Sequence, residues 1–411
     1  MKCKVFYLLF SALLLFAGEK AEAQTYSKEL VKRVKRGDID AGIDLAICYG
    51  YGLGVKQNIE KATELFEKLA GSSSDYSNTQ GAEAAYEYGV FLIKIKSNSF
   101  RYKYSAVAGQ GVAYIHCAAE RGYERAQLIF ARMHRGKIWT SELCNHYYNT
   151  TYFRNNYLYD LGFYTDAVHW YQKAASQGKA AIQIEFADYL AEAAGYDPQA
   201  PEIAVYWYKT AAEQGDDKAQ VKYGYCWQKG FGIQKSDEEA LKWFMKAAKL
   251  GNAEGMCRVG ILFLGITRSF EIENQEDEFS LSEGTDTGGD ERQQGIDWLK
   301  KSAELNYPEA PYYLGVFYKE CERNEGEAFK WFYAGSRLEN AKAYYELGCC
   351  YEEGRGCPAD IKNAAVYYEK AAQKGIKKAV EKMVYFYENG IGVYKDKQKA
   401  EEYRKEGNLL P

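Results

Sequence analysis

The sequence predicts an all-α fold, an α/α superhelical solenoid in which helix–turn–helix units stack one on another. Three observations predict it: a unit of about 36 residues that recurs along the chain, glycine pairs at one place in the unit, and alanines beside aromatic residues near its end. The clearest copy runs from Gly215 to Leu250, and the next begins at Gly251. A fixed period of about 20–50 residues is typical of solenoid proteins.

About nine units align on their first residue, which is most often glycine. The intervals between several of them are longer than 36 residues, which indicates insertions within a continuous array. The units begin at Gly37, Gln80, Gly122, Gly178, Gly215, Gly251, Asn306, Glu339 and Gly375.

Small residues recur at two places in the first half of the unit, four and nine residues after its start. Glycine inside a helix costs about 0.5–1 kcal/mol relative to alanine. Its repeated use therefore predicts that a neighbouring helix comes too close for a side chain. The clearest examples are Ala41, Ala219, Ala343 and Ala379 at the first place, and Gly224, Gly315 and Gly348 at the second.

A pair of glycines follows, 15 and 17 residues after the start of the unit. Glycine tolerates positive φ, so the pair can end one helix and redirect the chain. The pairs are Gly52 and Gly54, Gly230 and Gly232, Gly354 and Gly356, and Gly390 and Gly392.

The second helix should begin at a capping side chain, whose oxygen accepts from free backbone N–H groups. The candidates are Asn58, Asp237, Asp360 and Asp396. Further along, an aromatic residue and an alanine such as Phe244 and Ala247 can share one helical face.

This pattern resembles the Sel1-like repeat family, a relative of the tetratricopeptide repeat. The resemblance covers Gly37 to Gly407 and is strongest in the units that start at 37, 215, 339 and 375. It implies a right-handed superhelix that acts as an adaptor for other proteins, with no enzyme chemistry and no cofactor. We expect residues 24–36 to form a capping helix and residues 37–411 to form a single solenoid.

Residues 1–23 have the features of a signal peptide. Lys2 and Lys4 precede an apolar run from Val5 to Phe16, which is too short for a comfortable membrane span. Ala21-Glu22-Ala23 fits a cleavage site before Gln24. We expect export to the periplasm or envelope of a bacterium, or secretion. A retained membrane anchor is the alternative.

The composition excludes some partners. Hydrophobic residues make up 47% of the chain and charged residues 27%, as in ordinary soluble proteins. The formal net charge is −4 and there are no basic clusters, so we expect no nucleic-acid binding. No other stretch is apolar over 18 residues, so we expect no transmembrane segment after signal cleavage.

The first insertion, at about 136–164, is dense in aromatic residues. Connecting loops normally stay on the surface, so these rings are candidates for binding a partner. The alternative is that they pack on neighbouring helices as an additional core. The candidates are Trp139, Tyr147, Tyr148, Tyr152, Phe153, Tyr157 and Tyr159.

The second insertion, at about 265–293, contains a polar stretch with nine acidic residues and no basic residue. Such a composition favours a disordered, solvated loop. An acidic docking segment and a Ca²⁺ site are alternatives, but the ligand spacing of a calcium loop is missing.

No catalytic set and no metal site stand out. Patterns such as GxSxG, HExxH and the P-loop do not occur. A metal site at His134, Cys144 and His146 has only weak support from their spacing. The cysteines do not form a regular framework, and Cys350 and Cys357 are the one pair that we name as a candidate bridge.

We therefore expect a non-enzymatic scaffold or adaptor. The first helices of stacked units should line a concave surface that binds a protein or peptide. The second hypothesis is that aromatic platforms of this protein bind cell-wall or polysaccharide glycans. A hydrolase that acts on cell-wall-like or β-lactam substrates is the third.

Overall fold

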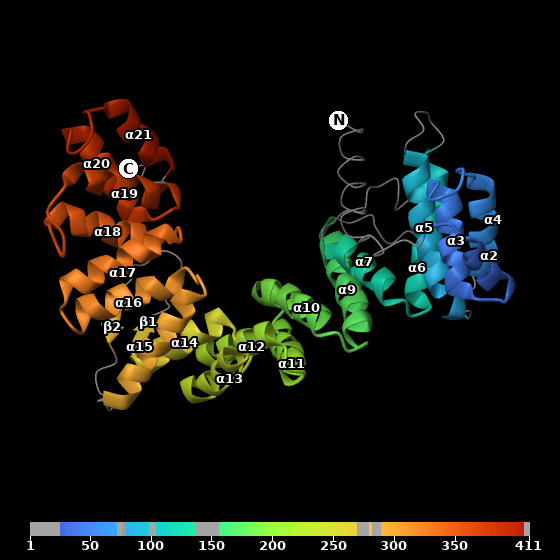
Figure 1. Cartoon of the computed structure of the whole chain (residues 1–411), viewed down its shortest axis with the longest axis horizontal. Helices are drawn as coiled ribbons and strands as arrows, with labels where there is room; N and C mark the ends of the chain where they lie inside the picture. Colours follow the sequence, from blue (N-terminus) through green and yellow to red (C-terminus); the bar gives the residue numbers. More distant parts are fainter. Residues whose placement is uncertain are drawn as a thin grey trace. The chain divides into compact units, whose positions relative to one another are not determined.

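The computed structural model describes residues 25–71, 77, 79–97, 104–135, 156–268, 279–281 and 289–406. Helices account for nearly all of the described residues, which confirms the predicted all-α class (Figure 1). The chain divides into two compact units, Met1–Trp207 and Tyr208–Pro411, which we name the N-terminal and the C-terminal unit.

The N-terminal unit holds the helices drawn from blue to green in Figure 1. One short 3₁₀ turn, Thr79–Gly81, comes directly before a helix, and another, Ala193–Gly195, lies between two helices. The last helix, Ala200–Glu213, continues past Trp207 into the C-terminal unit. The helices are α2 (Lys28–Lys35), α3 (Ile39–Tyr51), α4 (Ile59–Ala70), α5 (Ala82–Ser97), α6 (Tyr104–Glu120), α7 (Glu124–Arg135), α9 (Asn156–Ala175), α10 (Ala180–Glu192) and α11 (Ala200–Glu213).

The C-terminal unit adds ten helices and a small hairpin among the described residues. In the hairpin, β1 (Ile266–Arg268) pairs antiparallel with β2 (Phe279–Leu281), and Ile266 lies opposite Leu281. The helices are α12 (Asp217–Lys229), α13 (Asp237–Lys249), α14 (Ala253–Phe263), α15 (Gly289–Glu304), α16 (Glu309–Glu320), α17 (Glu325–Arg337), α18 (Ala341–Glu353), α19 (Ile361–Gln373), α20 (Lys377–Asn389) and α21 (Lys397–Glu406).

From α3 onward the helices fall into pairs, one pair for each unit of the sequence repeat. In the C-terminal unit each helix from α12 to α21 packs against the next one along the chain. The first helices of successive pairs also touch, as α14 touches α16 and α16 touches α18. Contacts of this kind, between each repeat and its neighbours, define a solenoid.

The small residues of the first helices make room for aromatic rings of the second helices. A Cβ atom at Gly224 would lie 2.6 Å from the ring of Phe244, and one at Gly315 would lie 2.5 Å from Phe332. Both rings are fully buried. The repeated glycine therefore allows a large side chain to reach the backbone of its partner helix.

The glycine pairs end the first helices in left-handed backbone. Gly230 and Gly354 are the C-caps of α12 and α18, with φ of 69° and 73°. Asn58 and Asp360 cap the second helices α4 and α19, as expected. The expectation for Asp237 was wrong: Ser236 caps α13, because its hydroxyl accepts from the Glu239 N–H and leaves Asp237 in the first turn.

Two of the three units that lack glycine at their first place, those at Asn306 and Glu339, have left-handed backbone there. Glu339 has a φ of 56°, where the matching Gly375 has 87°. We predict that Glu339→Gly stabilises the C-terminal unit by about 0.5–1 kcal/mol, since left-handed backbone is unfavourable for a residue with a Cβ atom. The lost Lys374–Glu339 ion pair lies on the surface and contributes little.

The midpoint of urea unfolding measures this effect. Glu381→Gly is the matched control, since Glu381 is exposed within α20 and glycine there should destabilise by about 1 kcal/mol. A Glu339→Gly variant that unfolds at lower urea than the wild type would contradict the prediction.

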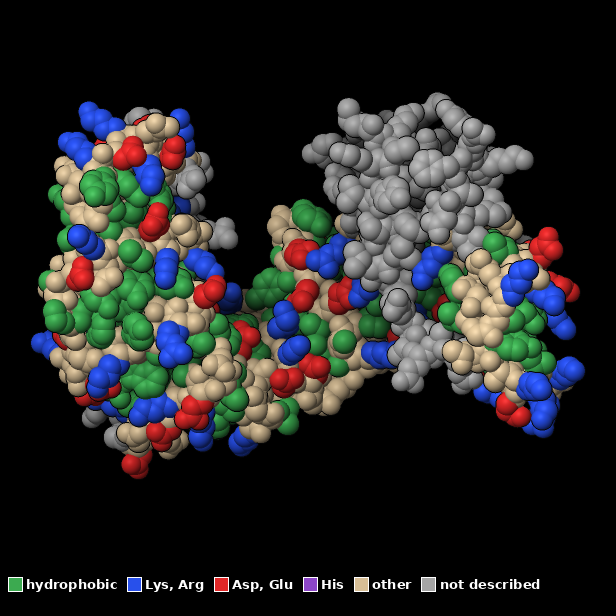
Figure 2. Space-filling model, turned by 45° about the horizontal axis from the view of Figure 1, so that its top comes forward, with side chains coloured by type: hydrophobic (Ala, Val, Ile, Leu, Met, Phe, Trp, Pro, Cys, Tyr) green, Lys and Arg blue, Asp and Glu red, His purple; other side chains and the backbone are tan. Residues whose placement is uncertain are grey.

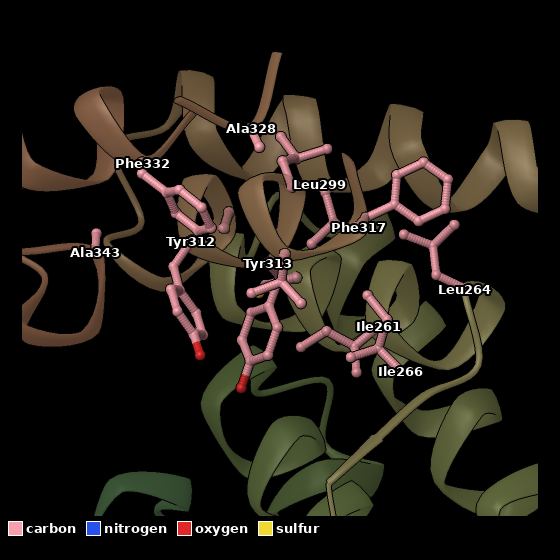
Figure 3. Close-up of a cluster of buried hydrophobic side chains, with 14 of the residues drawn as sticks. Ile261, Leu264, Ile266, Leu299, Tyr312, Tyr313, Phe317, Ala328, Phe332 and Ala343 are labelled. Atoms are coloured by element: carbon pink, nitrogen blue, oxygen red, sulfur yellow. The ribbon is translucent and has the colours of Figure 1, made fainter. Parts of the chain in front are cut away.

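A core at the centre of the C-terminal unit joins the hairpin to the helices (Figure 3). Ile266 of β1 is only 3% exposed and packs in the same cluster as Ile261 of α14 and Leu299 of α15. The expectation of a disordered, solvated loop was wrong within the polar stretch (residues 271–291), because Phe279–Leu281 form β2 and α15 already begins at Gly289.

Candidate partner-binding surface

The aromatic residues predicted for partner binding lie largely beyond what the structure describes. Trp139, Tyr147, Tyr148, Tyr152 and Phe153 are outside the described residues. The backbone of Tyr157 and Tyr159 lies in the first turns of α9, while their side chains are not described.

The predicted loop boundary at residue 164 was wrong, because α9 already begins at Asn156. The sequence contains a signal for this earlier start. Leu158, Leu161 and Tyr164 recur every three residues, a spacing that favours a helix.

A different group of aromatic side chains lies partly exposed on the C-terminal unit. It consists of Phe329 and Tyr333 of α17, Tyr351 of α18 and Tyr367 of α19, and we name it the aromatic patch. Tyr333 is 45% exposed, and the other three side chains are half-buried. Figure 2 shows that hydrophobic side chains gather over one face of this unit, interspersed with single charged residues.

The four rings hold one another in place. Phe329 stacks on Tyr333 with centroids 6.4 Å apart and meets Tyr351 edge to face at 5.5 Å. Tyr351 in turn stacks on Tyr367 at 5.6 Å, with the ring planes only 5° from parallel. Aromatic pairs in such arrangements contribute about 0.5–1.5 kcal/mol beyond their buried area. The patch is therefore ordered before any partner arrives.

Beneath the patch lies the core of Figure 3, against which Phe329, Tyr351 and Tyr367 pack. Burial raises the pKa of the Tyr351 and Tyr367 hydroxyls, so both stay protonated at neutral pH and can donate hydrogen bonds. On one side the Lys370 ammonium lies 5.4 Å from the Tyr367 ring. The patch thus combines apolar area, hydroxyl donors and one cation.

The repeat pattern explains why the sequence analysis missed this group. Counted from the start of the second helix, Phe329 and Tyr333 match Ala365 and Glu369 of α19. Tyr333 thus departs from the repeat, whereas Tyr351 stands at a place that is also aromatic in the units at 37, 215 and 375. A search for aromatic residues at normally polar places would have found Tyr333.

Several titrating groups with strongly shifted pKa values lie between successive helix pairs and have partners there. Arg132 of α7 donates to both carboxylate oxygens of Glu185 of α10, at 2.8 and 2.7 Å, and the Tyr171 hydroxyl donates to the same carboxylate. Burial is the main cause that raises the Tyr171 pKa. These groups connect repeats, and their pairing gives them a structural role. We call such polar contacts between successive repeats seams. Other seams are Arg258–Glu309, Tyr225–Glu254, Lys319–Glu346 and Lys382–Glu352.

The described ranges were searched for metal clusters and for helices that could span a membrane. No group of three or more His, Cys, Asp or Glu side chains within them is arranged to hold a metal ion. Cys144 and His146, named above beside His134, fall outside the description. Every described helix is too short or too polar to cross a bilayer. Cys350 and Cys357 are free thiols, so the candidate bridge is not formed.

Comparison with protein families assigns the chain. The family model described as the Sel1 repeat matches more than half of its residues. The chain belongs to the Sel1 repeat family. The matched segments are 40–72, 164–179, 189–216, 217–252, 281–307, 308–340, 341–376 and 382–403.

A solved structure agrees with this fold. The Sel1 repeat protein from Oxalobacter formigenes superposes with a TM-score of 0.60 at 20% identity, covering 98% of this chain and 96% of that one. At this level of identity the likeness shows the Sel1 repeat fold alone.

Curated relatives match over shorter stretches. The DAP3-binding cell death enhancer 1 of Rattus norvegicus is 34% identical over 94 residues, 23% of this chain and 18% of the relative. Chitin synthase regulatory factor 2 of Schizosaccharomyces pombe is 25% identical over 191 residues, 44% of this chain and 34% of the relative. The chain spans about a third of these relatives or less. Because they are eukaryotic, the expected exported bacterial type stays a prediction.

Proposed function

We propose that this Sel1 repeat protein is a scaffold that binds an apolar or aromatic segment of a protein partner at the aromatic patch. The observation that carries the proposal is a set of four partly exposed rings, pre-ordered by their own contacts. Tyrosine and phenylalanine are enriched in protein interfaces, and tyrosine is frequent among the residues that dominate binding energy. Rings already held in place lose little conformational freedom on binding.

The family supports a binding role over a catalytic one. Sel1 repeat solenoids stack into extended surfaces suited to protein partners. The printed names of the two curated relatives describe a DAP3-binding protein and a regulator of chitin synthase. The titrating groups described above, whose pKa values are shifted, are paired within the seams between repeats and therefore have a structural role.

Two elements of the sequence analysis belong to the same proposal. We infer that residues 1–23 direct export, on the strength of their basic start and apolar run. The group from Trp139 to Tyr159 and the concave face of the first helices are the alternative surfaces for this partner, and the tests below distinguish them from the aromatic patch. The exposed Tyr385 of α20, on the first helix of the last repeat, is the reference residue outside the patch in the tests below.

We predict that Tyr333→Ser weakens partner binding about 10- to 100-fold, as expected for an aromatic anchor at the centre of an interface. A photo-crosslinking amino acid at position 333 first identifies the bound protein in cells that make this chain. The Kd is then measured with purified partner and each variant. Tyr385→Ser is the matched control, because its ring is 54% exposed in the same unit but lies outside the patch.

Equal affinities of the Tyr333→Ser variant and the wild type would refute the patch as the site. Loss of binding after deletion of 137–155, with the Tyr333→Ser variant unaffected, would move the site to the group that contains Trp139. This deletion ends at 155 because α9 begins at Asn156. Recovery of polysaccharide without protein would favour the glycan hypothesis.

A further inference from the structure

The turn between the two helices of a complete repeat brings two of its residues together. One lies in the first helix, eleven places after the start of the unit; the other follows the glycine pair, at eighteen places. In the unit at 37 these are Cys48 and Val55, which pack in one cluster. In the unit at 375 they are Phe386 and Val393, again in one cluster.

The unit at 339 carries cysteine at both of these places. Cys350 is 2% exposed within the core of Figure 3, and the half-buried Cys357 packs against that core. The Cys357 thiol donates to the carbonyl of Cys350 at 3.6 Å. The N–H of Arg355 also donates to this carbonyl, at 2.9 Å, so the turn folds directly back over the end of α18.

The adjacent Cys349 points elsewhere. It belongs to the core shared by α18, α19 and α20, where the Tyr368 hydroxyl lies 3.3 Å from its sulfur. Neighbouring residues of a helix are about 100° apart around its axis, so Cys349 and Cys350 face different sides of α18. The contacts of the two neighbouring cysteines therefore identify Cys350, and not Cys349, as the partner of Cys357.

We propose that Cys350 and Cys357 are a redox modification site, at which a disulfide oxidant such as oxidised glutathione forms a reversible bridge across the turn between α18 and α19. The half-buried Cys357 reacts first: its thiolate attacks the oxidant, forms a mixed disulfide and releases one reduced glutathione. The Cys350 thiolate then attacks the Cys357 sulfur and releases the second. The two protons lost by the cysteine thiols are taken up, through solvent, by the two departing glutathione thiolates, and two electrons reduce the oxidant.

The surroundings agree with this order of steps. Burial raises the pKa of Cys350 to about 12, which makes its thiol a poor first nucleophile. Burial, with the Asp360 carboxylate second, also raises the pKa of Cys357, so the reaction should be slow at neutral pH and faster at pH 8–9. The bridge is a property of this repeat and does not rest on the proposed partner binding.

The test exposes the full chain to glutathione buffers from fully reduced to fully oxidised, followed by alkylation, trypsin and mass spectrometry. Arg355 lies between the two cysteines, so cleavage there leaves two peptides that stay linked only by a disulfide. A Cys349→Ala background removes ambiguity about the sulfur involved. We expect the linked pair of peptides to appear with loss of two free thiols, and to disappear with dithiothreitol.

Cys357→Val is the matched control, since valine occupies this place in the units at 37 and 375 and should preserve the packing. This variant should fold with an unchanged helical circular dichroism spectrum and form no linked pair. Glutathione that stays on Cys357 without forming the bridge would overturn the proposal. So would persistence of both free thiols in the fully oxidised buffer at pH 8.5, or a Cys349–Cys357 link in the wild type.

Discussion

Replacing Gly356 by alanine is expected to destabilise the C-terminal unit by about 3–4 kcal/mol. Gly356 has a φ of 70°, which costs a residue with a Cβ atom about 1–2 kcal/mol. A Cβ atom there would also lie 2.1 Å from the carbonyl oxygen of Glu325, in the preceding helix pair. Backbone must move to relieve that overlap, and overpacking of this kind costs about 1–3 kcal/mol.

Gly375→Ala separates the two contributions. Gly375 has a φ of 87°, but a Cβ atom there would meet no other atom within 4 Å. The control should therefore lose about 1–2 kcal/mol, from backbone strain alone. Urea unfolding combined with hydrogen exchange of α17 and α19 measures both variants. Equal losses in the two would contradict the close contact between successive repeats at Gly356.

Acidification from pH 7 to pH 4 is expected to destabilise the N-terminal unit by about 2–3 kcal/mol through His134. This side chain of α7 is only 3% exposed, and burial, with the charge of His116 second, lowers its pKa to about 3. The unfolded chain binds a proton near pH 6.5. The contribution to stability is therefore complete above pH 6.5 and is lost progressively as pH falls toward 3.

Asp166 limits the size of this effect. Its carboxylate oxygen lies 3.8 Å from Nδ1 of His134 and favours the charged imidazole, so we expect less than the roughly 3.3 kcal/mol that the two pKa values alone would give at pH 4. Hydrogen exchange of α7, corrected for the intrinsic rate at each pH, measures the opening free energy.

His134→Leu should reduce the dependence on pH between 6.5 and 4 in this helix. His169→Leu, at an exposed place on α9, is the matched control for removal of a histidine. A pH dependence that persists unchanged in the His134→Leu variant would show that other groups, such as the Arg132–Glu185 seam, govern the acid response.

Most of the fold could be predicted from the features that recur in the sequence repeat. Gly224, Gly354 and Ala343 occupy places that recur in several units, so each copy supports the interpretation of the others. Steric contact explains why they recur: the ring of Phe244 leaves no room for a side chain at Gly224. Features of this kind depend on local geometry alone and can be predicted from one sequence.

What could not be predicted lies where the chain departs from the repeat. The strand at Ile266 forms through pairing with Leu281, across a stretch whose composition favours disorder. The aromatic patch depends on contacts between α17, α18 and α19, and Tyr333 holds a place that is polar in α19. Single occurrences gain no support from alignment of the repeats, and their significance emerges only from their neighbours in space.

Hydrogen exchange of the scaffold, alone and with saturating purified partner, tests the central claim most directly. The account predicts that the partner slows exchange in the backbone of α17 and α19 around Tyr333 and Tyr367, and leaves α20 around Tyr385 unchanged. Protection confined to α20, or to the segment that contains Trp139 and Tyr147, would contradict the aromatic patch as the binding surface.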